Sequence, residues 1–99
     1  MSRVRADIDT FYGDFPADFE FTITDDKIEG HYSFIGYIGD FNGSMTGPDT
    51  FTVEGIVDSY VGPIDFTITG RYDGKKVSGE GVTTSKGHFT VRGVIIGDV

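Results

Sequence analysis

A five-residue pattern occurs four times in this chain of 99 residues. Each copy begins with Phe and Thr, continues with Ile or Val and a polar residue, and ends with Gly or Asp; the copies are residues 21–25, 51–55, 66–70 and 89–93. Alternating apolar and polar side chains are typical of a β-strand with one buried face, and Gly and Asp tolerate the positive φ of a kink or turn. We therefore expect one strand design to recur around a sheet.

The composition agrees with an all-β chain. The sequence holds 15 Gly, nine Phe and five Tyr, residues that suit pleated surfaces or the bends between strands. No window has helical periodicity. Turn signals divide the chain into eight strands, expected at residues 3–10, 18–24, 27–35, 39–46, 50–58, 63–70, 75–83 and 87–96.

The connections between these strands favour a barrel. Compact turns at residues 25–26, 47–49 and 71–74 make consecutive strands antiparallel neighbours. A meander of eight strands can close on itself, whereas a Greek-key sandwich needs long crossing connections for which this chain has no length. We predict one domain, residues 1–99, folded as an eight-stranded antiparallel up-and-down meander closed into a small β-barrel; a sandwich or open sheet is the alternative.

The alternation also assigns the faces of the strands. The side chains expected to point inward are those of Phe19, Phe21, Ile23, Ile28, Tyr32, Phe34, Phe51, Val53, Ile64, Phe66, Ile68, Phe89 and Val91. Glycines in the same rows suit tightly bent strands, because a Cβ on the concave face would collide with its neighbours. The alternation is interrupted after Gly55 and Gly93, so a bulge that reverses the faces is a candidate at each.

The charge distribution argues against a nucleic-acid partner. Residues 1–70 carry 13 acidic and three basic side chains, residues 71–99 carry three acidic and five basic ones, and the net charge is -8. Binding a phosphate backbone requires clustered Lys and Arg. We expect the acids to form a solvated outer face; a dedicated acidic docking surface is the alternative.

Several other classes of protein are excluded by residues that the sequence lacks. There is no Cys, which rules out disulfides, thiolate metal sites and thiol nucleophiles. Residues 1–5 lack the apolar run of a signal peptide, and no stretch approaches the ~20 apolar residues of a membrane helix. We expect a soluble, cytoplasmic monomer with no membrane partner.

The two ends of the predicted barrel should differ. The compact turns share one end, whereas the connections at the other end are rich in aromatic and aliphatic residues. The candidate ligand-binding residues there are Phe11, Tyr12, Phe15, Tyr37, Ile38, Tyr60 and Val61, in a loop at residues 11–17 and in turns around residues 37–38 and 60–61. They form either a lid or the mouth of a ligand site, because an eight-stranded interior is packed solid or holds one small ligand.

The sequence offers no motif for catalysis or metal binding. It has two histidines, His31 and His88, and no Ser in a nucleophile context. The acids map to outer faces and turns, where nothing is expected to raise a pKa as glycosidase chemistry requires. We expect no enzymatic activity, no cofactor and no metal.

Two hairpins resemble those of the de novo designed fluorescence-activating β-barrels. One is residues 44–54, which contain Gly47, Pro48 and Asp49 in their turn, and the other is residues 73–81, with an Asp-Gly turn and a Ser-Gly-x-Gly strand. The resemblance implies an engineered scaffold with no natural biological role. Those designs carry a tryptophan near the barrel base and this chain has no Trp, so no pocket residue is carried over.

These observations predict a non-catalytic barrel, a designed or design-like scaffold or a binder of one small apolar ligand at the aromatic mouth. The alternative function is that of an acidic protein-binding module or inhibitor. It would dock through the first 70 residues, where Glu20, Glu29 and Glu54 are expected to point outward.

Overall fold

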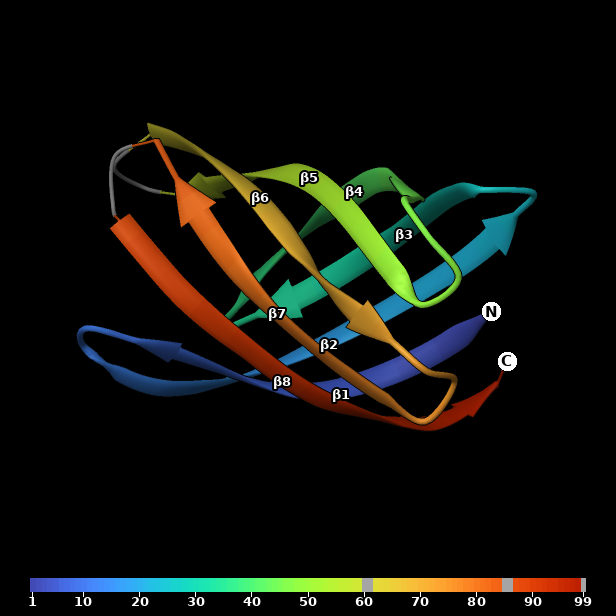
Figure 1. Cartoon of the computed structure of the whole chain (residues 1–99). Coiled ribbons are helices and arrows are strands. Elements are labelled where there is room, and N and C mark those ends of the chain that lie inside the picture. Colours follow the sequence, from blue (N-terminus) through green and yellow to red (C-terminus); the bar gives the residue numbers. More distant parts are fainter. Residues whose placement is uncertain (60–61, 85–86, 99) are drawn as a thin grey trace.

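Eight segments in which apolar and polar residues alternate form a closed antiparallel barrel (Figure 1). In this computed structural model, which describes residues 1–59, 62–84 and 87–98, each strand pairs with its neighbours in sequence and β8 closes on β1. The strands are β1 (Ser2–Thr10), β2 (Gly13–Thr24), β3 (Lys27–Phe34), β4 (Tyr37–Met45), β5 (Thr50–Ser59), β6 (Gly62–Tyr72), β7 (Lys76–Thr83) and β8 (Gly87–Asp98). The predicted fold, an eight-stranded up-and-down barrel, is confirmed.

The alternation of each strand places its apolar side chains inside the barrel. Every side chain predicted to point inward is buried or half-buried. Val57 and Ile95 pack against the core, whereas their neighbours Ile56 and Val94 are exposed. The alternation therefore continues past Gly55 and Gly93, and the reversal of faces considered there is wrong.

Close to the end of β8, its pairing with β1 shifts by one residue. Arg3 pairs with Gly97 and Val4 pairs with Ile95, so Ile96 is an extra residue on the β8 side. Its side chain is exposed. Such an extra residue has no counterpart on the partner strand; it forms a β-bulge, which bends the strand.

The interior is built from aromatic rings that lie over glycines of the neighbouring strand. The directly paired residues are Gly30 with Phe41, Gly39 with Tyr32, Gly55 with Phe66, and Gly81 with Phe89. A Cβ on Gly39 or Gly55 would lie 2.6 Å from the facing aromatic side chain. The glycine therefore provides the space in which the ring packs, as in tightly curved sheets.

The connection between β1 and β2 is shorter than the sequence suggested. We expected a loop over residues 11–17, but β1 ends at Thr10 and β2 begins at Gly13, which adopts a φ of 125°. Pro16 lies within β2, just before Ala17, where the pairing with β3 starts. A proline outside that ladder removes none of its hydrogen bonds, so the strand continues through it.

The connection between β3 and β4 also lies elsewhere than predicted. The turn was expected around Tyr37 and Ile38, whereas both residues begin β4 and the turn consists of Ile35 and Gly36. Both turn residues have positive φ, 43° and 90°. Two positive φ values are required by the tight hairpin turn that matches the twist of the strands, and Gly36 was the signal that the sequence analysis missed.

Backbone hydrogen bonds between the compact turns and nearby strands fasten one end of the barrel. The backbone N–H of Met45 donates to Asp26, that of Tyr72 donates to Asp49, and that of Ile95 donates to Lys75, at 2.7–2.8 Å. Each bond joins a compact turn to the second strand after it, which is β4, β6 or β8. Among the described residues, no such bond joins the turns at the other end, which we call the mouth.

Candidate functional site

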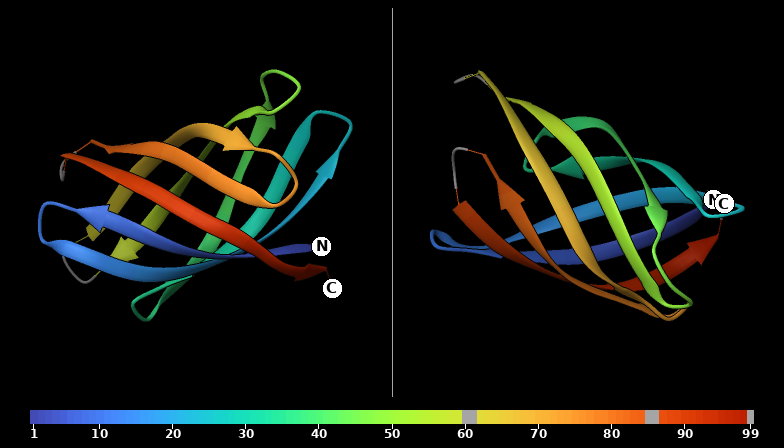
Figure 2. Two further views of the ribbon diagram at one scale, coloured as in Figure 1. Left: turned by 60° about the horizontal axis from the view of Figure 1, so that its bottom comes forward. Right: turned by 45° about the horizontal axis from the view of Figure 1, so that its top comes forward.

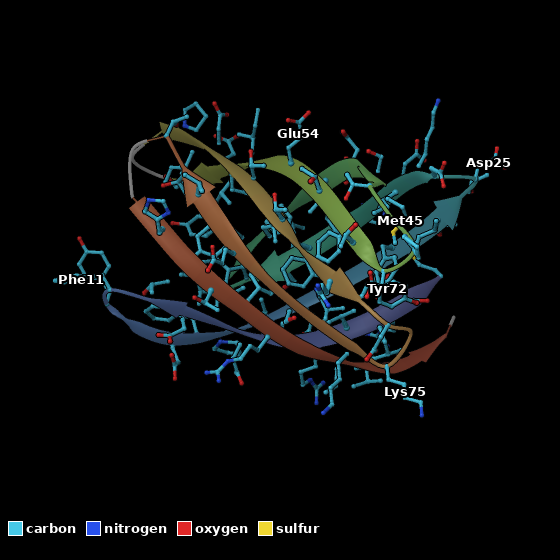
Figure 3. The ribbon with its side chains drawn as sticks, in the orientation of Figure 1. Phe11, Asp25, Met45, Glu54, Tyr72 and Lys75 are labelled. Carbon is cyan, nitrogen blue, oxygen red and sulfur yellow. The ribbon has the colours of Figure 1, made fainter. Side chains whose placement is uncertain are left out.

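An open cavity of about 520 Å³ occupies the mouth half of the barrel. Its lining includes the aromatic residues Phe11, Tyr12, Phe15, Phe19, Tyr32, Phe34, Tyr37, Phe66 and Phe89. Figure 3 shows Phe11 at the mouth, at the tip of the β1–β2 hairpin, and Asp25, Met45, Tyr72 and Lys75 at the fastened end. Pockets that hold small ligands have similar volumes and predominantly apolar walls.

A second cavity lies in the fastened half of the barrel. It has a volume of about 60 Å³ and is lined by apolar residues and Tyr72. Phe19 and Ile68 line both cavities, and the ring of Phe19 packs edge-on against Phe41 with 5.8 Å between ring centres. These two side chains therefore form the floor of the large cavity.

Four of the seven residues predicted to bind a ligand line the large cavity: Phe11, Tyr12, Phe15 and Tyr37. Phe11 and Tyr12 are 94% and 80% exposed and pack against each other, whereas Phe15 and Tyr37 are half-buried. In this structure these four residues line the cavity without closing it.

The other three predicted residues are not brought into this site. Ile38 does not line the cavity; it occupies an outward position on β4, and its side chain is 79% exposed. The strand begins two residues earlier than expected, and the shift moves Ile38 from a turn to an outer face. Tyr60 and Val61 lie outside the described residues.

Seven of the 19 described residues that line the cavity are strand residues that the sequence assigned to the inner face. Tyr32, Phe34, Ile64, Phe66 and Phe89 all point inward, as their alternation predicts, and all line the cavity. Alternation identifies the inner face of a strand. It cannot distinguish a side chain that packs against others in the core from one that lines a cavity. For Tyr32, Phe66 and Phe89 the additional signal was the glycine paired with each ring, which lets the ring lie close to the wall.

Four hydroxyl groups of the cavity wall donate their protons to the backbone. Tyr32 Oη donates to the carbonyl of Ile56 at 2.7 Å, and Ser59 Oγ donates to the carbonyl of Gly62 at 2.7 Å. Thr10 and Thr83 donate in the same way to the first residue of the following strand. A hydroxyl whose proton is used in this way offers only its oxygen lone pairs to a ligand.

The barrel wall is incompletely paired between β4 and β5. Among the described residues, the β4–β5 ladder contains five residue pairs and ends at Phe41 and Gly55, whereas each of the other seven ladders contains seven to ten pairs. The two strands diverge toward the mouth in Figure 1 and Figure 2. We call this region, residues 37–40 of β4 and 56–59 of β5, the seam; Tyr32 donates its hydrogen bond across it.

The electrostatic environment of the seam is negative. Burial and then the charges of Asp40 and Asp58 raise the pKa of Tyr32 above its ordinary value of 10.0. Both carboxylates are exposed on the outer face, and Asp40 Oδ1 lies 2.6 Å from His31 Nδ1. No Lys or Arg of the described residues lines the large cavity.

One carboxylate pair corrects the expectation that no acid has a raised pKa. Asp9 and Asp14 face each other across β1 and β2. A hydrogen bond with Asp9, together with the repulsion between the two charges, raises the pKa of Asp14 above its ordinary 3.8. Both side chains are exposed on the outside of the hairpin, so this pair does not face the cavity.

Other kinds of site have little support in the described part of the chain. It contains no group of three or more His, Asp or Glu side chains placed to hold a metal ion. His31 is exposed beside Asp40, and His88, also exposed, lies at the cavity rim. Residues 1–59, 62–84 and 87–98 include no helix with the length and apolarity needed to cross a membrane.

No protein-family model matches the sequence, and neither does any curated protein. Among solved structures, the barrel is similar to that of a redesigned β-barrel, mFAP1, bound to DFHBI. The TM-score is 0.71 and the match covers 94% of this chain and 90% of that chain, with 13% sequence identity. The resemblance to designed β-barrels is thus confirmed for the fold.

Proposed function

We propose that this protein is a non-catalytic binder of one small, mainly aromatic ligand, which it holds in the cavity at the mouth. The observation that carries this proposal is the open cavity of about 520 Å³ with its aromatic wall. A barrel of this size is otherwise filled by side chains, as the fastened half is, with its residual volume of about 60 Å³. Side chains around the unfilled half lack van der Waals contacts on one side. A bound ligand would supply these contacts.

The rim residues add to the argument. Phe11 and Tyr12 are exposed although both are large and apolar or amphipathic, and such side chains around a cavity are typical of a binding site. The solved structure of mFAP1 is bound to DFHBI, which supports ligand binding by a barrel of this fold. In this proposal the predicted residues Phe11, Tyr12, Phe15 and Tyr37 contact the ligand, and Ile38 does not.

The experiment is titration of the protein with dimethylaminostyryl pyridine, a neutral dye whose fluorescence increases in apolar surroundings. We expect saturable binding of one dye per barrel and an increase in melting temperature, because a ligand that binds only the folded state stabilises it. Val57→Phe should weaken binding because Val57 lines the cavity and the larger ring would occupy part of it.

Val82→Phe is the matched control. It adds the same ring near the mouth, but Val82 is 46% exposed and does not line the cavity. This variant should therefore bind the dye with the same affinity as the parent protein. Circular dichroism of both variants checks that the barrel is folded. Absence of saturable binding, or equal binding by folded Val57→Phe, would contradict the proposal.

A further inference from the structure

We propose that the cavity selects an aromatic cation, with the ligand's ring among the aromatic side chains and its positive group in the seam between Tyr32, Ser59 and the carboxylates of Asp40 and Asp58. This inference rests on the proposed function, because it names the ligand class for the same cavity.

The first reason is the polarity of the seam hydroxyls. Tyr32 and Ser59 both line the cavity, and the proton of each is engaged with a backbone carbonyl at 2.7 Å. Their oxygens therefore remain as hydrogen-bond acceptors. A positively charged group of a ligand complements two such oxygens, whereas a carboxylate or phenolate would face their lone pairs.

The second reason is that the wall is thin where these oxygens lie. The β4–β5 ladder ends at Phe41 and Gly55, and beyond it no strand pairing separates the outer carboxylates from the cavity. Asp40 and Asp58 lie on the two strands of the seam, and after burial their charges contribute to the raised pKa of Tyr32, which is 5% exposed. A cation placed beside Tyr32 would gain from the same two charges.

The third reason is the nature of the remaining wall. Tyr32 and Phe66 meet edge to face with 5.6 Å between ring centres, and Phe15 meets Phe34 in the same way at 6.2 Å. Aromatic ring faces attract organic cations, most strongly when the cation is removed from water. The protein's net charge of -8 also raises the local concentration of cations.

The test compares two dyes that differ by one methyl group and one charge: dimethylaminostyryl pyridine, which is neutral, and its N-methylpyridinium derivative, which is cationic. We expect the cation to bind more tightly to the parent protein. Asp58→Asn should lower the affinity for the cationic dye by roughly three- to tenfold, because it removes one nearby, partly screened carboxylate charge. The affinity for the neutral dye should not change. Asp58 is preferred to Asp40 because Asp40 also contacts His31.

Asp25→Asn is the matched control, since it removes the same charge at the fastened end (Figure 3), and Asn tolerates the positive φ of 56° at that position. It should change neither affinity. Equal binding of the two dyes, tighter binding of the neutral dye, or equal effects of Asp58→Asn and Asp25→Asn on the cation would overturn the inference while leaving the proposed function intact. If neither dye binds, both are wrong.

Discussion

The hydroxyl of Tyr32, on β3, donates a 2.7 Å hydrogen bond to the carbonyl of Ile56, on β5, although β4 lies between them in the sheet. The bond lies beyond the last β4–β5 pair, Phe41 with Gly55. A side chain thus joins two strands at a point where the backbone ladder does not.

Replacing this hydroxyl should weaken the barrel locally. Tyr32→Phe leaves the Ile56 carbonyl without its partner, so we expect the free energy of unfolding in urea to fall by about 1 to 2 kcal/mol. Hydrogen exchange of the β4 amides near the mouth should accelerate. Tyr72→Phe is the control, because the Tyr72 hydroxyl makes no hydrogen bond among the described residues; equal losses in the two variants would show that the Tyr32 bond contributes nothing.

A methyl group at Gly43 should be much more disruptive than one at Gly97. A Cβ at Gly43 would collide with the backbone of Thr52 and Val53, whereas one at Gly97 would meet nothing within 4 Å. Because backbone must move, we expect Gly43→Ala to lower the free energy of unfolding by about 2 to 3 kcal/mol, and Gly97→Ala to change it by less than about 0.5 kcal/mol. Urea denaturation measures both, and similar values would contradict the role of Gly43 in strand curvature.

The turn residue Ile35 should be replaceable with a gain in stability. Its φ is 43°, a conformation that is costly for a β-branched residue and favourable for Asn before Gly. We expect Ile35→Asn to raise the free energy of unfolding by about 1 kcal/mol and to weaken dye binding, since Ile35 lines the cavity.

Ile56→Asn provides the comparison for that change. Ile35 and Ile56 are both 54% exposed, but Ile56 lies within a strand, where Asn is disfavoured. Its replacement should therefore lower stability. A loss of stability in Ile35→Asn as well would mean that apolar contact outweighs turn strain.

The carboxylate pair on β1 and β2 should make stability depend on pH. The pKa of Asp14 is raised above 3.8, so the folded state binds this proton more tightly than the unfolded chain does. The associated stabilisation is complete below pH 3.8 and is lost as pH rises through the raised value. Asp14→Asn should therefore raise the melting temperature near neutral pH and lose this advantage in acid.

Thermal melts at a series of pH values test this prediction, with Asp65→Asn as the control. Asp65 is exposed and pairs with Ile56 rather than with a carboxylate. A pH-independent difference between Asp14→Asn and the parent protein would disprove the repulsion between Asp9 and Asp14.

Phe19 should determine the depth of the ligand cavity. Because its ring lines both cavities, Phe19→Ala should join them and allow a longer dye, such as one with an added alkyl chain, to bind. The lost ring should cost about 3 kcal/mol of unfolding free energy. Phe15→Ala, at the rim of the large cavity only, should not favour the longer dye; equal preferences would mean that Phe19 is not the floor.

Local sequence patterns were enough to predict the barrel but not the shape of its mouth. The fourfold motif and the short turns predict strands, faces and closure because each depends on residues close together in the chain. The turn at Ile35 was missed because an isoleucine conceals a conformation normally signalled by Asn or Gly. The strand through Pro16 was missed because its tolerance depends on the three-dimensional arrangement: Pro16 pairs with Asp7 of β1, but the ladder with β3 begins only at Ala17.

The candidate site, too, could be predicted from the sequence only in part. Phe11, Tyr12, Phe15 and Tyr37 were found because aromatic residues near a turn are unusual, but the cavity beneath them depends on how far each ring lies from rings on other strands. The hydrogen bond between Tyr32 and Ile56, separated by 24 residues, has no local signal. The end of the β4–β5 ladder likewise depends on barrel geometry, and the seam could not be predicted.

The pairing of rings with glycines also restricts how this sequence can vary. Phe66 faces Gly55 and Phe51 faces Gly70, so the second and third copies of the repeated motif each place a Phe opposite the final Gly of the other. Neither position can be altered independently, because a larger residue at Gly55 meets Phe66 and a smaller one at Phe66 leaves Gly55 uncovered. In a library of functional variants, Gly55 and Phe66 should covary, and recombination that separates β5 from β6 should yield fewer folded proteins than recombination that keeps them together.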